Sequence, residues 1–169
     1  MSKDQARAYA TYAFLQYNHF GRPTAEDLAN SIKDAVSKKY SWKSAEKISE
    51  ITDKELFRMH RLIDDIAAVD TTFRILRGEA PVPLGFNAEF MKKHGADIAD
   101  AVEKVYFAFR RNNIPAKKIG GVVRAYATES YCDERTAYRR LRIACRLFAT
   151  VRGITCDWTD EIKISDYDE

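Results

Sequence analysis

Apolar side chains recur every three or four residues along most of the chain, the spacing that places them on one face of an α-helix. The first such face predicts a helix that ends at the sequence GRP, residues 21–23. Thr24 then occupies the position of an N-cap, with Glu26 and Asp27 in the first turn of a second helix that continues to Tyr40. The first face is formed by Ala6, Tyr9, Ala10, Ala13, Tyr17 and Phe20.

The next segment predicts a short helix over residues 43–51 and a long helix that runs to Leu76. Thr52 and Glu55, three residues apart in the sequence TDKE, form a capping-box pattern that predicts where the long helix begins. Residues 78–87, with the sequence GEAPVPLGFN, contain two prolines and two glycines and cannot continue a helix. Residues 79–87 are therefore either a linker between domains or a turn between packed helices.

Three further helices are expected after this break, over residues 96–111, 116–129 and 133–150. Gly153 is expected to end the last of them as a C-terminal cap. The predicted fold class is all-α: a helical bundle with a C-terminal helix-turn-helix-like unit. The chain divides into an N-terminal bundle (1–78), a connecting segment (79–87), a basic helical region (88–152) and an acidic tail (153–169).

The last predicted helix has two faces. Its arginines recur at steps of four, three and four, which places them on one side of the helix. Its apolar residues form a stripe on nearly the opposite side, so one face is expected to be buried and the other to be a row of guanidinium groups. The arginines are Arg135, Arg139, Arg142 and Arg146; the apolar stripe is Ala137, Leu141, Ala144, Cys145 and Phe148.

Charge is distributed unevenly along the chain, although the net charge is only +3. Residues 104–152 carry 12 Lys and Arg against 3 Asp and Glu, whereas residues 153–169 carry 1 against 6. A basic segment of this kind is typical of a site for a polyanion. Residues 135–152 contain no acid at all, and like charges along one helix repel one another unless a partner neutralises them.

Two helices joined by a short turn can present the second helix to the major groove of DNA, because the first helix fixes its angle. Here residues 123–127 form the supporting helix, residues 130–132 the turn, and Asp133 the N-cap of the reading helix. Ala127 is small enough for close contact between the helices, and Ala137 and Leu141 are expected to hold the second helix to the first.

The sequence RTAYRRL, residues 135–141, resembles the reading helix of Fis-type and resolvase-type DNA-binding domains and of sigma-factor region 4. The resemblance spans about 25 residues, and it implies duplex binding in the major groove by Arg135, Tyr138, Arg139 and Arg142. Tyr131 departs from the pattern, since these turns usually have a glycine there, at a position that often needs positive φ.

The predicted function is a DNA-binding protein, a transcriptional regulator that reads duplex DNA. The residues expected to contact nucleic acid are Arg135, Tyr138, Arg139, Arg142, Arg146, Lys117, Lys118 and Arg124, with Arg110 and Arg111 as further phosphate contacts. The N-terminal bundle would then serve oligomerisation, in a homo-oligomer, or partner binding. Three alternatives stay open: a solvated helix face, a helical subunit that binds RNA or single-stranded DNA by stacking on Tyr126, Tyr131 or Tyr138, and an adaptor for an acidic protein.

Features of other protein classes are missing from the sequence. It has no phosphate-binding loop, nucleophile elbow or zinc-protease motif, so neither an enzyme nor a cofactor is expected. Asp64 and Asp65 are better explained as a polar helix face than as metal ligands. Three cysteines without a CxxC spacing favour free thiols in a reducing cytoplasm. No apolar run is long enough to cross a membrane. The tail is expected to be partly disordered, although Trp158 and Tyr167 offer a way for it to dock on a partner.

Overall fold

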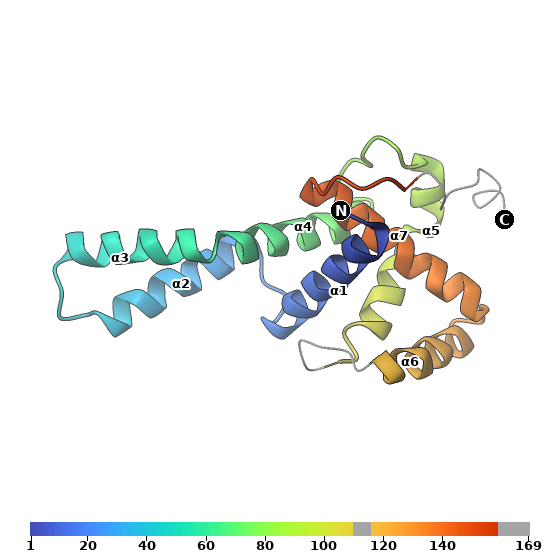
Figure 1. Ribbon diagram of the computed structural model, residues 1–169, viewed down its shortest axis with the longest axis horizontal. Helices are drawn as coiled ribbons and strands as arrows, with labels where there is room; N and C mark the ends of the chain where they lie inside the picture. Colours follow the sequence, from blue (N-terminus) through green and yellow to red (C-terminus); the bar gives the residue numbers. More distant parts are fainter. Residues whose placement is uncertain (110–115, 159–169) are drawn as a thin grey trace.

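A computed structural model describes residues 1–109 and 116–158, and it shows an all-α fold (Figure 1). No strand occurs in these two ranges. The helices are α1 (Lys3–His19), α2 (Ala25–Lys39), α3 (Ala45–Arg58), α4 (His60–Leu76), α5 (Ala88–Val105), α6 (Ala116–Glu129) and α7 (Glu134–Arg152).

Several helix ends lie where local sequence chemistry predicted them. Thr24 caps α2 through a capping box with Asp27, because each side chain accepts a hydrogen bond from the other residue's backbone N–H. Asp133 caps α7 by accepting a hydrogen bond from the backbone N–H of Thr136, at 2.6 Å. Gly153 ends α7 in the left-handed conformation, with φ of 76°.

The predicted start of a long helix at Thr52 is wrong. Thr52 lies inside α3, where its hydroxyl donates a hydrogen bond to the carbonyl of Ile48 at 2.7 Å and is therefore not free to cap a helix end. The helix begins instead at Ser44, whose hydroxyl accepts from the backbone N–H of Lys47. The interruption falls at Met59, and α3 and α4 run almost in one line (Figure 1).

The helix predicted over 96–111 begins earlier than expected and is described as α5, Ala88–Val105. Asn87, the last residue of the proline-containing segment, accepts a hydrogen bond from the N–H of Phe90 and so starts the helix eight residues sooner. Gly95 lies in close contact with the backbone at Leu76, since an added Cβ would come within 3.1 Å of the Leu76 carbonyl carbon. This contact brings the end of α4 directly against α5. The helix also ends earlier than predicted: Val105 is its last residue, and the chain turns over residues 106–108 where the prediction continued the helix to 111. Residues 112–115, which were expected to end it, lie outside the described residues.

α7 is the central helix of the body, in contact with α1, α4, α5 and α6 (Figure 1). One hydrophobic core joins residues from both sides of segment 79–87, with Phe14, Ile66, Val102 and Phe148 fully buried in it. Segment 79–87 is therefore a turn between helices that share a core, the second of the two readings of the sequence.

Helices α2 and α3 form a hairpin, here called the arm, that projects from the body (Figure 1). Only Leu28 and Val36 of α2 are buried, and none of the described residues of α3 is. The arm is thus held mainly by the contact between its own two helices and by its base on α4.

The chain after α7 folds back on the body as far as Trp158, which is only 9% exposed and packs with Ala6 and Ala149. The structure thus gives Trp158 a contact within the chain, in place of the expected role of docking the tail on a partner. Tyr167 and the rest of the acidic tail lie outside the described residues.

Candidate nucleic-acid interface

Helices α6 and α7 are held together by the small apolar contacts that the sequence predicted. Val123 and Ala127 of α6, and Ala137 and Leu141 of α7, are all buried in the common core. In the turn between the helices, the N–H of Cys132 donates to the carbonyl of Ala127 at 3.0 Å. The two helices therefore form one packed unit joined by a tight turn.

Tyr131 in this turn has φ of 52°, the left-handed conformation that glycine usually supplies. Its side chain is 98% exposed, so the described part of the fold gives the ring no packing role. The turn thus has a tyrosine where the resembled families usually have a glycine. This tyrosine adopts a backbone conformation that is unfavourable for it, close to the start of α7.

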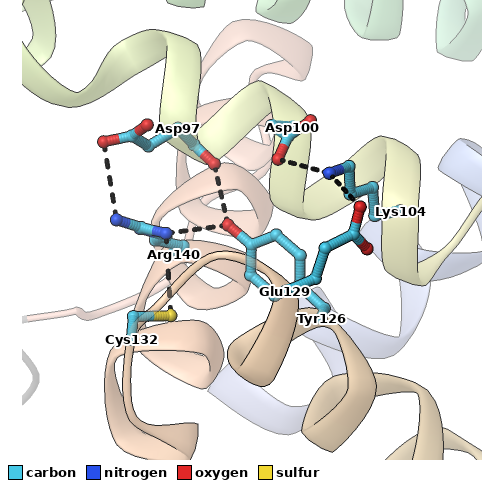
Figure 2. A network of polar contacts seen from close by, with 7 residues as sticks. All are labelled: Asp97, Asp100, Lys104, Tyr126, Glu129, Cys132 and Arg140. Carbon is cyan, nitrogen blue, oxygen red and sulfur yellow. Dashed lines mark hydrogen bonds and ion pairs between the residues drawn. The ribbon is translucent and has the colours of Figure 1, made fainter.

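Arg140 fixes α6 and α7 against α5 (Figure 2). Its Nη1 donates to the hydroxyl of Tyr126 at 2.8 Å, and its Nη2 lies 3.4 Å from a carboxylate oxygen of Asp97. The Tyr126 hydroxyl in turn donates to the backbone carbonyl of Asp97 at 3.3 Å, and the thiol sulfur of Cys132 lies 3.8 Å from Arg140 Nη1. Burial disfavours the charged guanidinium, but the hydrogen bond to Tyr126 and the charge of Asp97 leave the pKa of Arg140 raised.

A second set of polar contacts joins α5 to the end of α6 in the same region (Figure 2). Lys104 Nζ lies 2.9 Å from a carboxylate oxygen of Glu129 and 3.6 Å from one of Asp100. These groups are more exposed than Arg140, so they stabilise the arrangement only weakly. Together the two sets fix the orientation of the α6–α7 unit on the body.

The outward face of the N-terminal half of α7 carries Arg135, Arg139 and Arg142, which we call the arginine face. At about 100° per residue their side chains leave the helix within about 60° of one another. Arg135 and Arg142 are exposed and Arg139 is half-buried, with its guanidinium carbon 6.0 Å from the ring centre of Phe90. No carboxylate of the described residues lies within 4.0 Å of these three guanidinium groups.

Arg146 shares the helical spacing of the arginine face but has a different environment. Its Nη2 donates to the carbonyl of Gly85 at 3.1 Å, and its guanidinium carbon lies 4.6 Å from the ring centre of Phe86. Nε and Nη1 are buried without a hydrogen-bond partner among the described residues. Arg146 therefore holds the loop before α5, and the arginine face ends at Arg142.

The other side chains that were predicted to contact nucleic acid differ in their surroundings. Arg124 of α6 pairs with Glu134 of α7, with 3.0 Å between Nε and a carboxylate oxygen, and Lys118 is exposed on α6. Tyr138 is half-buried, and its hydroxyl lies beside Gly120, where an added Cβ would be 3.9 Å away. The side chain of Lys117 lies outside the described residues, as do Arg110 and Arg111.

A buried ion pair that the sequence analysis missed joins α4 to α7. Arg152 Nε donates to a carboxylate oxygen of Asp65 at 2.7 Å, and Nη2 lies 3.7 Å from Asp64. The Tyr9 hydroxyl also donates to Asp65, at 2.8 Å, and burial together with this carboxylate raises the pKa of Tyr9. The expectation of a polar helix face holds for the exposed Asp64 but not for Asp65, which is buried and paired with Arg152.

The described residues lack the features of two other kinds of site. They contain no group of three or more His, Cys, Asp and Glu side chains that could hold a metal ion. Within the same residues, none of the helices combines the length and the apolar character that crossing a bilayer requires. Comparisons of the chain with protein-family models, curated proteins and solved structures return no match. The molecule is thus defined by its fold, an all-α protein with a packed α6–α7 unit, and by the arginine face on that unit.

Proposed function

We propose that the protein binds duplex DNA through the N-terminal half of α7, with Arg135, Arg139 and Arg142 in the major groove. The observation that carries the proposal is the difference among the arginines of α7. Arg140 and Arg152 have carboxylate partners and Arg146 donates to a backbone carbonyl, whereas the guanidinium groups of the arginine face have neither among the described residues. Guanidinium groups without an internal hydrogen bond or ion pair are available for phosphates and for the guanine edge.

The position of the face on the helix supports this proposal. In helix-turn-helix proteins, the N-terminal part of the reading helix contacts the base edges. Here the N-terminal half of α7 carries most of the exposed side chains of the helix, whereas most of the C-terminal half is buried, at Ala144, Cys145, Leu147, Phe148 and Ala149. Lys118 and Arg124 lie on α6, where phosphate contacts of the supporting helix are expected, and Arg124 would exchange its exposed pair with Glu134 for a phosphate.

The finer proposal is a transcriptional regulator that acts as a homo-oligomer. A single short reading helix contacts few base pairs, so specific recognition generally needs a second half-site and therefore a second copy. In this proposal the N-terminal helices, which carry few of the basic contacts, hold the copies together.

A second candidate is a subunit that binds single-stranded DNA or RNA through the same face. The exposed ring of Tyr131 favours it, because bases stack on accessible aromatic side chains. Tyr126 does not contribute to such stacking, since it is buried beneath Arg140. The two candidates differ in whether α7 prefers a duplex.

The test measures binding of the full chain to a labelled duplex, to the matching single strand and to an RNA of the same sequence, each over a range of salt concentrations. If Arg135, Arg139, Arg142, Lys118 and Arg124 each neutralise one phosphate, the logarithm of the duplex association constant falls with the logarithm of salt with a slope of about −4.5. Replacing Arg139 and Arg142 with alanine then reduces the slope by about 1.8. Arg74→Ala, at an exposed arginine of α4, is the matched control and keeps the wild-type slope.

The outcomes separate the candidates. A preference for duplex that the double variant abolishes supports the proposal, provided that circular dichroism shows an intact fold. Equal binding of the wild-type protein to all three ligands supports the single-strand candidate. Absence of binding to any nucleic acid contradicts both and leaves an acidic protein as the partner of the arginine face.

A further inference from the structure

The end of the arm carries a cluster of exposed and half-buried aromatic and basic side chains, here called the arm tip. It consists of Lys38, Lys39, Tyr40, Trp42 and Lys43. Residues 37–45 contain these three lysines and no acid. The arm tip lies at the far end of the α2–α3 hairpin, on the opposite side of the molecule from α6 (Figure 1).

The two rings and two of the lysines are in mutual contact. The ring centres of Tyr40 and Trp42 are 5.7 Å apart at an interplanar angle of 53°. Lys43 Nζ lies 5.9 Å from the centre of each ring, and Lys39 Nζ lies 5.4 Å from that of Tyr40. Cation–π contacts of this kind hold the ammonium groups beside the rings while leaving them hydrated and available to an anion.

The exposure of Trp42 has no explanation in the packing of the arm. Its side chain is 74% exposed, although indole is among the side chains that gain most from burial. The charged residues along α3 form pairs with one another, as in Lys47 with Glu50 and Arg58 with Glu55. The lysines of the arm tip have no carboxylate within 4.0 Å among the described residues.

We infer that the arm tip is a second nucleic-acid site, which binds an unpaired strand by stacking a base on Trp42 and placing the lysines on the flanking phosphates. Exposed aromatic rings among basic side chains are what single-strand binding uses, since every base has a face that stacks. A lipid surface fits less well, because residues 37–45 offer two rings and three serines but no long aliphatic side chain to insert. The inference is independent of the proposed role of α7.

Tryptophan fluorescence tests the inference directly. The chain has two tryptophans, Trp42 and Trp158, and Trp158 is buried against α1 and α7. In Trp158→Phe protein the emission therefore reports the arm tip alone. Titration with a deoxythymidine oligonucleotide of about 12 nucleotides is expected to quench it, since that length spans a typical single-strand site.

Variants of the unmodified chain give a second measurement that does not depend on Trp158→Phe. With the oligonucleotide labelled, Trp42→Ala is expected to weaken binding about tenfold or more. Replacing Lys39 and Lys43 with alanine reduces the salt slope by about 1.4. Phe57→Ala, at an arm residue that is 77% exposed but lies outside the arm tip, is the matched control and leaves the affinity unchanged.

Three results would overturn the inference. The first is unquenched Trp42 emission together with wild-type affinity of Trp42→Ala. The second is quenching that disappears when Arg139 and Arg142 are replaced, because the signal then belongs to α7. The third is a response to vesicles that contain phosphatidylserine without a response to the oligonucleotide, which assigns the arm tip to lipid. Quenching that persists when Arg139 and Arg142 are replaced supports the inference, even if α7 proves not to bind DNA.

Discussion

Replacing Arg140 with alanine is predicted to destabilise the fold by about 2–3 kcal/mol without removing any group of the arginine face. The Arg140 side chain is 18% exposed and donates to the Tyr126 hydroxyl at 2.8 Å. A hydrogen bond with one charged partner contributes about 1.5–3 kcal/mol. The contact with Asp97, whose side chain is 54% exposed, adds at most about 1 kcal/mol because solvent screens it.

Urea unfolding followed by circular dichroism measures this loss, in a cycle with Tyr126→Phe. The Tyr126 hydroxyl both accepts from Arg140 and donates to Asp97, so its removal is expected to cost about 1–2 kcal/mol. Because the two side chains share one hydrogen bond, the double variant should lose about 1–1.5 kcal/mol less than the sum of the single losses. Arg135→Ala, on the same helix but exposed, is the control and changes stability by less than about 0.5 kcal/mol.

The affinity for nucleic acid should respond in the opposite way to the free energy of unfolding. Below its unfolding midpoint Arg140→Ala keeps the arginine face and loses little affinity, whereas Arg139→Ala loses affinity and at most about 1 kcal/mol of stability, from its contact with Phe90. Additive losses in the cycle, or a stability of Arg140→Ala within about 0.5 kcal/mol of wild type, would refute the structural role that we assign to Arg140.

Two further substitutions test the fold around the site. Asp65→Ala leaves the Arg152 guanidinium without its closest partner and should lower the free energy of unfolding by about 3 kcal/mol, or the thermal midpoint by about 6–12 °C. Replacing the exposed Asp64 with alanine should cost less than about 1 kcal/mol. Equal effects of the two substitutions would contradict the difference in burial between the two carboxylates. Tyr131→Gly should raise the free energy of unfolding by about 0.5 kcal/mol, and Tyr131→Val should lower it by about 1 kcal/mol. The reason is that φ of 52° suits glycine and not a β-branched side chain. The reverse order of stability in urea unfolding would be inconsistent with the left-handed turn.

The parts of the fold that the sequence predicted are those that local chemistry decides. Thr24, Asp133 and Gly153 act on hydrogen bonds within three or four residues of themselves, so their roles follow from the sequence alone. The buried stripe of α7 was predicted for the same reason, since helical spacing places Ala137 and Leu141 on one face. The capping pattern at Thr52 failed because the same residues also continue a helix that begins at Ser44.

The parts that were missed depend on contacts between residues far apart in the chain. Arg139 and Arg146 have the same periodicity, but the loop at Gly85 and Phe86 covers only the second. The partner of Arg140 on α5 is 43 residues away, and that of Arg152 on α4 is 87 residues away. Periodicity identifies the face of a helix on which an arginine lies; it does not identify which neighbouring element meets that face.

The central position of α7 has a consequence for how this protein can be divided. The helix that presents the arginine face is also the one around which α1, α4 and α5 assemble, so a fragment cut at the start of α6 would expose Leu147 and Phe148 to water. The end that carries the arginine face and the end buried in the core belong to the same helix. The α6–α7 unit therefore cannot be separated from the body as a folded fragment. A ligand bound at one end of α7 is held by the whole folded body, and unfolding of the body releases it.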